Sequence, residues 1–215
     1  MNTIQYLINQ AIFRGVSEET IILLILLPLV ASAVAAARHL LGFRGFGILI
    51  PTAIAVTFVV TGISTGIFVF LTILAVATLA RWLLKKLRLH YLPRMSLLLW
   101  FVTLVVLALI ITAPFFELQE LTAISIFPII ILILLFEDFI GVQIGKSFRE
   151  AVRLTTETII IALLGFVIFK FELLRKWALV YPHWLILAPV VLNLLIGRFT
   201  GLRLFEHRRF RRLLK

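Results

Sequence analysis

Long apolar runs separated by short basic segments are the feature that most constrains this chain. A run of about 17–25 apolar residues is long enough to cross the hydrocarbon layer as a helix, which satisfies its own backbone hydrogen bonds. With 62% hydrophobic and 14% charged residues, the 215-residue chain also has more apolar surface than a soluble core of this size can hide. The sequence therefore predicts an all-α, polytopic transmembrane bundle.

Seven runs are predicted to span the membrane. They cover residues 20–37, 46–62, 66–84, 95–113, 121–137, 156–171 and 182–198. The expected organisation is an interfacial N-terminal segment at 1–19, a seven-helix domain at 20–198 and a basic cytoplasmic tail at 199–215. Within the first of these, residues 4–13 are expected to form an amphipathic helix in the membrane interface.

The basic residues predict the orientation. If the N-terminus lies outside, only Arg14, Lys170, Arg175 and Lys176 are outside, and the other 17 of the 21 Lys and Arg residues are cytoplasmic. Cytoplasmic segments carry an excess of Lys and Arg, so the N-terminus is expected outside and the C-terminus inside. The net charge of +11 is then explained by anionic head groups, above all at the tail, without a nucleic-acid partner.

Two parts of the chain resemble each other. Pro51 in F-G-I-L-I-P-T-A-I matches Pro128 in I-S-I-F-P-I-I-I-L, and Pro93 and Pro182 open the fourth and seventh spans. About 12 extra residues in the second copy fit a longer connection at 138–155, which is expected to be interfacial or partly inserted. Three spans per copy predict an inverted repeat, in which interrupted helices meet at a polar midplane site. The alternative is chance similarity between apolar helices.

The glycine-rich segment Gly42-Phe43-Arg44-Gly45-Phe46-Gly47 precedes the second span. Glycines before a helix allow backbone N–H groups to face an anion, with Arg44 adding positive charge. The alternative interpretation is a tight turn back into the membrane.

Three carboxylates lie near the ends of proposed spans, namely Glu137, Asp138 and Glu157. Carboxylates at membrane depth are unfavourable unless they are paired or hydrated, so each is a candidate functional residue. The alternative is structural neutralisation by the basic residues of the same loop: Lys146, Arg149 and Arg153.

Asn193 lies inside the seventh span, and Gly197 and Gly201 follow at four-residue steps on one helix face. Small residues at this spacing predict close helix contact, with the amide bonding to a neighbouring helix. Arg198 is the first basic residue of the predicted tail, which rests on lipid head groups or docks a cytoplasmic partner.

Hydrolytic and metal chemistry have little support. Gly62-Ile63-Ser64-Thr65-Gly66 has the letters of a nucleophile elbow, but it joins two apolar helices, and only His183 lies on the same side as a base. A glycine-rich hairpin explains it better. Cysteine is absent and the four histidines are scattered, so no metal site and no cofactor is predicted.

From about Gly42 to Phe210, the chain resembles the bacterial seven-helix membrane domain usually fused to an inactive transglutaminase-like domain. The matching residues are Gly45-Phe46-Gly47 with Ile50-Pro51, Thr61-Gly62 with Gly66, Pro93-Arg94, Ile124 to Pro128 with Glu137, Gly197 to Leu204, and Arg209-Phe210-Arg211. Asp138 stands where a basic residue is expected after the family's glutamate, which weakens any ion-pair role there. R-G-F-G-I-L-I-P is also similar to the small membrane subunit of poly-γ-glutamate capsule synthesis.

The resemblance implies a setting in the bacterial cytoplasmic (inner) membrane, where a peptide is made, exported or processed. It also implies an ATP-grasp ligase-like protein and a retropepsin-like protease as neighbours. Since only 19 residues precede the first span, the transglutaminase-like domain is expected on another polypeptide or is missing. The first hypothesis is therefore a non-enzymatic conduit or scaffold of an envelope peptide or polyglutamate system. The alternatives are a membrane anchor or signalling module, and a self-sufficient small-molecule transporter.

Overall fold

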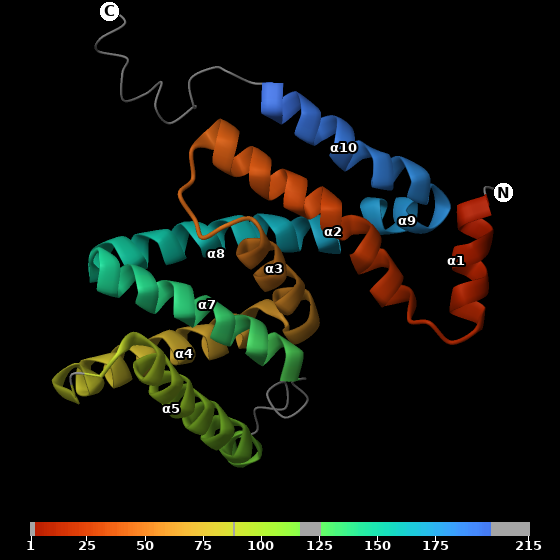
Figure 1. Ribbon diagram of the computed structural model, residues 1–215. Helices are drawn as coiled ribbons and strands as arrows, with labels where there is room; N and C mark the ends of the chain where they lie inside the picture. The colour runs from red at the N-terminus through yellow and green to blue at the C-terminus, as the bar shows by residue number, and fades with distance from the viewer. Residues whose placement is uncertain (1–2, 88, 117–125, 199–215) are drawn as a thin grey trace, which may run out of the picture. The chain divides into compact units, whose positions relative to one another are not determined.

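The computed structural model describes residues 3–87, 89–116 and 126–198. These residues form helices and turns, with no strand among them. Within them, five helices are long and apolar enough to cross a membrane, or six if one sharply bent pair counts as a single span. The predicted all-α transmembrane fold is therefore confirmed (Figure 1).

Each of the seven predicted spans contains a helix. These helices are α2 (Glu18–Ala36), α3 (Leu49–Thr61), α4 (Ile63–Leu84), α5 (Tyr91–Thr112), α7 (Ile126–Gly145), α8 (Phe148–Lys170) and α10 (Pro182–Arg198). Two further helices are α1 (Thr3–Phe13), at the position expected for the N-terminal amphipathic helix, and α9 (Glu172–Val180). Three short segments extend helix ends: the π-helical η1 (Ala37–Leu41) and the 3₁₀ segments η2 (Lys85–Leu87) and η3 (Ala113–Phe116).

Two of the seven helices are short for a membrane span. Helix α3 has 13 residues and α10 has 17, whereas about 20 residues are needed to cross the hydrocarbon layer. Helix α10 is preceded by α9, and the two meet at a bend of 112°. Tyr181 leaves the helical conformation at this bend, and Pro182 begins α10, where a proline costs no hydrogen bond.

The predicted connection at 138–155 is wrong. Helix α7 continues to Gly145 and α8 begins at Phe148, so only two residues join them. The helix continues because Phe139 and Ile140 are 3% and 0% exposed and pack into the core, while the side chain of Gln143 is also buried. The backbone N–H of Glu150 donates to Ser147 Oγ at 3.1 Å, which caps the start of α8.

Pro51 and Pro128 lie in apolar helices, as expected, and each is the third residue of its helix. The first four N–H groups of a helix have no intrahelical acceptor, so a proline there breaks no hydrogen bond. Neither proline therefore interrupts its helix. The helices with internal prolines are α2 and α10, at Pro28 and Pro189.

The extra residues of the second proposed copy are also placed differently. Since α7 and α8 are joined directly, they do not form a connecting loop. Instead, α7 has 20 residues against 13 in α3, and the nine-residue α9 precedes α10. The inverted repeat itself stays a prediction.

The chain divides into two compact units, of which the first comprises Met1–Val56 and Glu157–Lys215. In this unit α2 packs against α9 and α10, and α1 contacts both of the latter (Figure 1). Its core is made of large side chains with at most 1% exposure. They are Leu26, Val30, Ile54, Ile161 and Phe169. At the start of α2, Glu19 forms an ion pair with Arg175 of α9.

A polar chain links α10 to α2 within the first unit. The amide Nδ2 of Asn193 donates to Ser32 Oγ at 2.8 Å, and Ser32 Oγ donates to the Pro28 carbonyl at 2.8 Å. The interhelical bond expected of Asn193 is therefore present. The close contact expected at Gly197 is not, because a Cβ built there meets no atom within 4 Å.

The second unit comprises Thr57–Thr156. Helix α4 packs against α5 and α7, and α5 also contacts α7. The core of this unit holds large side chains with at most 1% exposure. They are Phe58, Phe70, Ile73, Leu98, Leu132, Leu135 and Ile140.

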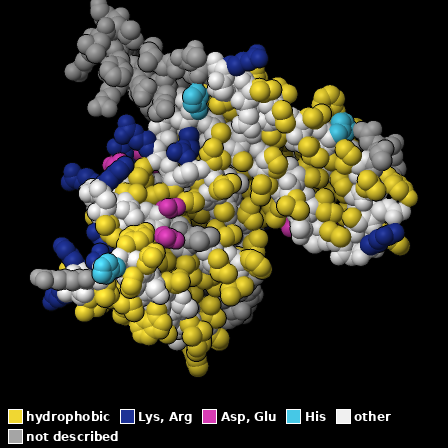
Figure 2. Space-filling model, viewed as in Figure 1, with side chains coloured by type: hydrophobic (Ala, Val, Ile, Leu, Met, Phe, Trp, Pro, Cys, Tyr) yellow, Lys and Arg dark blue, Asp and Glu magenta, His cyan; other side chains and the backbone are white. Residues whose placement is uncertain are grey.

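The surface of the described residues is strongly apolar. Hydrophobic side chains cover most of the face shown in Figure 2. Examples from four of the long helices are Leu24, Leu71, Leu107 and Leu164, each 47–63% exposed. Apolar surface on this scale is unfavourable in water and is expected where helices face lipid.

Candidate functional site

The glycine-rich segment between η1 and α3 is the place where the structure joins two predicted functional residues, Arg44 and Glu157. Gly42 ends η1 with φ of 91°, and Gly47 has φ of 27°. Such positive φ values are strained for residues with a Cβ, so the two glycines allow the chain to turn on both sides of Arg44.

Two backbone N–H groups of this segment bind the same turn of α8. The N–H of Arg44 donates to the carboxylate of Glu157, and the N–H of Phe46 donates to Thr158 Oγ1 at 2.9 Å. Phe46 and Thr158 are buried, and Glu157 is half-buried. We call this arrangement the loop clamp, consisting of Arg44, Gly45, Phe46, Glu157 and Thr158.

Gly45 allows the close approach that the loop clamp needs. A Cβ at this position would lie 2.8 Å from Thr158 Oγ1 and 3.3 Å from Thr158 Cα. The second contact is with backbone, which cannot rotate away. Arg44 and Phe46 therefore each supply one backbone N–H donor. Gly45 lies between them and has no side chain, so α8 can come close.

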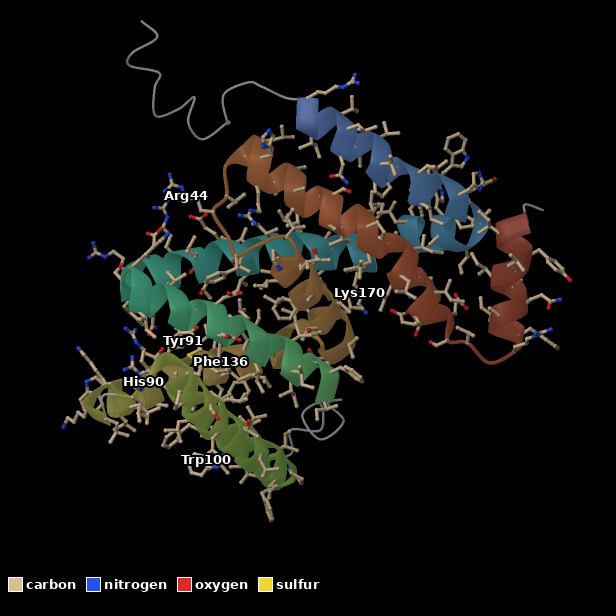
Figure 3. All side chains as sticks on the ribbon, viewed as in Figure 1. Arg44, His90, Tyr91, Trp100, Phe136 and Lys170 are labelled. Atoms are coloured by element: carbon tan, nitrogen blue, oxygen red, sulfur yellow. The ribbon has the colours of Figure 1, made fainter. Side chains whose placement is uncertain are left out.

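Both sequence interpretations of this segment hold in part. The amides do face an anion, but that anion is the chain's own Glu157 and not a ligand. The segment is also a turn leading into α3. Because the carboxylate accepts from the backbone, the Arg44 side chain is not held there, and it is exposed and projects away from the ribbon (Figure 3).

The loop clamp predicts a specific loss of stability in Thr158→Val. This change keeps the side-chain shape but leaves the buried N–H of Phe46 without an acceptor, which is expected to lower the free energy of unfolding by about 1–2 kcal/mol. Denaturant unfolding of the full chain in detergent measures it. Thr156→Val is the matched control, because the Thr156 hydroxyl is exposed and bonds only to Val152 O of its own helix. Equal stability of the two variants would contradict the loop clamp.

The other predicted site residues lie apart from the loop clamp in the chain's structure. Glu137, on α7 in the second unit, lines a cavity of about 250 Å³ with Met95, Ser96 and Phe136 among its neighbours. Arg198 is the last residue of α10 and is exposed, while the tail at 199–215 and Gly201 lie outside the described residues.

Residues 62–66 join two apolar helices, as expected: Gly62 makes the turn and Ile63 begins α4. Gly62 has φ of 80° between α3 and α4, so no strand leads into Ser64. A Cβ at Gly66 would lie 2.6 Å from Phe58 Cδ1 and 2.9 Å from Thr61 Oγ1, and the glycine therefore serves helix packing. In the described part of the chain, no group of three His, Cys, Asp or Glu residues is placed to hold a metal ion.

Sequence reasoning missed a polar cluster in the second unit. Arg81 of α4 donates to both the side-chain and the backbone oxygen of Gln143 on α7, and Gln143 Nε2 donates to Thr78 Oγ1 at 3.2 Å. Gln143 is only 4% exposed. The one available signal was a glutamine in a strongly apolar run.

The fold thus defines a multi-pass helical membrane protein. A family profile described as seven transmembrane helices usually fused to an inactive transglutaminase matches residues 5–214, and the chain belongs to this family. The suspected resemblance is therefore confirmed. No curated protein and no solved structure matches the chain significantly.

Proposed function

We propose that this chain is a non-enzymatic membrane subunit of a cell-envelope peptide or polyglutamate system, and that it acts as a scaffold for partner proteins. The observation that carries the proposal is the family match over residues 5–214, since members are usually fused to an inactive transglutaminase. A membrane domain joined to a domain without chemistry is suited to holding and recognising, not to catalysis. The poly-γ-glutamate likeness of R-G-F-G-I-L-I-P points to the same setting.

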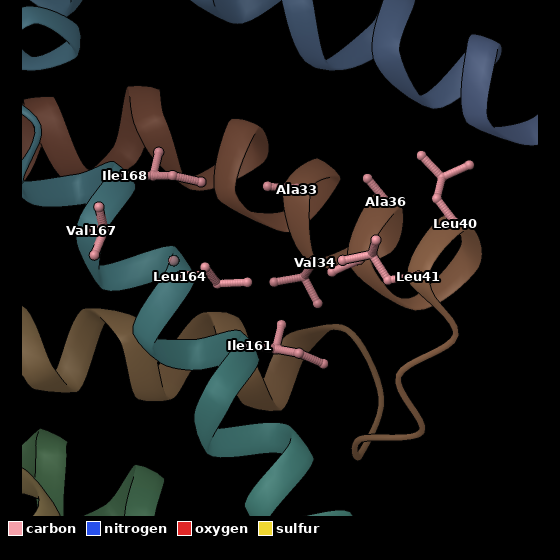
Figure 4. Close-up of a pocket in the computed structure, with 11 residues that line it drawn as sticks. Ala33, Val34, Ala36, Leu40, Leu41, Ile161, Leu164, Val167 and Ile168 are labelled. Carbon is pink, nitrogen blue, oxygen red and sulfur yellow. The ribbon is translucent and has the colours of Figure 1, made fainter. Parts of the chain in front are cut away.

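An apolar cavity in the first unit favours a scaffold over a conduit. The cavity of the first unit, about 470 Å³, is lined by apolar side chains of α2, η1 and α8 (Figure 4). Ala33, Leu40, Ile161 and Leu164 are among them. A peptide or polyglutamate chain carries an amide or charge at every residue, and an apolar wall leaves these groups without hydrogen bonds. This cavity suits an acyl chain better than a polymer of that kind.

Two of the predicted site residues, Pro51 and Asn193, have structural roles. Pro51 is buried in the first turn of α3, and the amide of Asn193 is bound to Ser32. Neither residue lines a cavity described above. The carboxylate of Glu157 accepts a hydrogen bond from Arg44 in the loop clamp. The polar groups of Asn193 and Glu157 are thus committed to the structure of the chain.

Co-purification from native membranes tests the scaffold. The full chain is isolated in a mild detergent, and bound proteins are identified by mass spectrometry, with an unrelated multi-pass protein carrying the same tag as control. A ligase-like or transglutaminase-like protein is expected to be enriched at least tenfold over the control. Recovery of the chain with lipid alone would contradict the scaffold and favour a self-sufficient transporter or a lipid-binding anchor.

Arg44→Gln sharpens this experiment. The Arg44 side chain is exposed, and only its backbone N–H joins the loop clamp, so the variant is expected to fold normally. Arg14→Gln removes a charge from the segment expected on the opposite side of the membrane. If a cytoplasmic partner binds the basic residues expected on the cytoplasmic side, Arg44→Gln lowers its recovery and Arg14→Gln does not.

A further inference from the structure

A basic cavity lies in the second unit, where the end of α4 meets the end of α7. Its volume is about 210 Å³, which equals the liquid volume of about seven water molecules. The residues that line it are Thr78, Arg81, Trp82, Lys85, Gln143 and Phe148. We call it the Arg81 cavity. It holds two cations, two neutral polar side chains and two aromatic rings.

The guanidinium of Arg81 is fixed in this cavity by a neutral residue. Its Nη1 donates to the side-chain oxygen of Gln143, and its Nη2 donates to the Gln143 carbonyl at 3.0 Å. An arginine has five N–H donors. The other three donate to no residue in the described part of the chain. The side chain is therefore oriented without being neutralised.

The charge of the Arg81 cavity is unbalanced. Lys85 follows Arg81 by four residues and lines the same space. Among the described residues, no carboxylate forms an ion pair with either cation. Arg94 of α5 adds repulsion to Arg81 instead of relieving it. Like charges one helical turn apart destabilise a helix, and near a membrane they are expected to attract an anion.

The aromatic side chains at the rim of the Arg81 cavity favour an anionic ligand at the level of lipid head groups. Trp82 and Phe148 are 66% and 56% exposed and flank the cations. Aromatic rings of this kind prefer the level of lipid head groups, and basic pockets between transmembrane helices bind anionic ones. Arginine also suits phosphate, because its fork of donors matches the phosphate oxygens.

We propose that the Arg81 cavity binds a phosphate group, held by the free N–H groups of Arg81 and by Lys85. An anionic phospholipid head group is the source that the aromatic rim favours, and a soluble phosphate is the other source of the same chemistry. The proposal is independent of the scaffold function, because it concerns a basic cavity formed by residues of the second unit alone.

Two neighbouring lysines provide a matched test. Lys85 lines the Arg81 cavity, and Lys86 is also exposed but does not line it. Native mass spectrometry of the full chain in detergent measures the dissociation constant for phosphatidylglycerol, with phosphatidylcholine as the zwitterionic reference. Lys85→Gln is expected to weaken phosphatidylglycerol binding about fivefold, the effect of one basic residue near anionic lipid. Lys86→Gln is expected to change it less than twofold.

Inorganic phosphate distinguishes the two sources. If the ligand is a lipid, millimolar phosphate does not displace phosphatidylglycerol. If the ligand is soluble, inorganic phosphate alone raises the unfolding temperature of the parent chain and does so less in Lys85→Gln. Equal weakening by Lys85→Gln and Lys86→Gln would show only diffuse surface charge and would overturn the site. Unchanged phosphatidylglycerol binding in both variants, with no effect of inorganic phosphate on the unfolding temperature of the parent chain, would overturn it as well.

Discussion

The Gly165→Ala variant is expected to unfold with a free energy about 1–3 kcal/mol below that of the parent chain. Gly165 lies in the C-terminal third of α8, where a Cβ would be 2.8 Å from Val30 Cγ1 and 2.9 Å from Ala55 Cβ. The Val30 side chain can turn, but Ala55 Cβ is fixed to the backbone of α3. The added methyl group therefore forces helices apart, and overpacking of a core costs energy of this size.

Gly141→Ala is the matched control, with an effect of opposite sign. Gly141 is also inside a transmembrane helix, but a Cβ there meets no atom within 4 Å. Alanine is favoured over glycine in a helix by about 1 kcal/mol, so this variant is expected to be slightly more stable. Denaturant titration of both variants in the same detergent measures the difference. Similar stabilities would show that α8 does not approach α2 and α3 closely at Gly165.

Glycines show clearly what the sequence can and cannot predict. The four-residue steps at Gly197 and Gly201, and the pair Gly141 and Gly145, are the pattern associated with close helix packing. In the structure, a Cβ at Gly141, Gly145 or Gly197 meets nothing, whereas one at Gly45, Gly66 or Gly165 meets a neighbour closely. Close packing requires a particular partner on another helix, and one-dimensional spacing does not contain that information.

The long apolar runs predicted the helices because hydrophobic length is a local property. The boundary between α7 and α8 was predicted poorly, since Asp138, Gln143 and the two glycines make this stretch look like a connection. A usable signal was present. Ser147-Phe148-Arg149-Glu150 matches the capping box S-x-x-E, and Ser147 Oγ does accept the N–H of Glu150.

The contacts of the loop clamp join residues that are far apart in the sequence. Arg44 and Glu157 were each recognised as candidates, but 113 residues separate them, and nothing in either segment indicates the other. Thr158 was missed because a threonine in apolar surroundings is an ordinary core residue. The position of a charge near the membrane was therefore predictable, and its partner was not.

The polar pair of the second unit, Arg81 and Gln143, is separated by 62 residues, and removing it is expected to be costly. Gln143→Leu keeps the side-chain volume but removes an acceptor from the Arg81 guanidinium and the donor to Thr78 Oγ1. Hydrogen bonds to charged groups contribute about 1.5–3 kcal/mol, so we expect a loss of about 2 kcal/mol in the free energy of unfolding. Gln10→Leu is the control, because Gln10 is exposed and bonds only to Tyr6 of its own helix.

Gln143→Glu separates the two roles of this residue. A carboxylate accepts from Arg81 as the amide oxygen does, and Thr78 has a hydroxyl that can donate to it, so stability is expected to stay within about 1 kcal/mol of the parent chain. The new negative charge neutralises Arg81 and is expected to weaken phosphatidylglycerol binding at least as much as Lys85→Gln. If Gln143→Leu is as stable as the parent chain, α4 and α7 do not meet through this pair. If Gln143→Glu binds the anionic lipid normally, Arg81 is a structural cation and the ligand lies elsewhere.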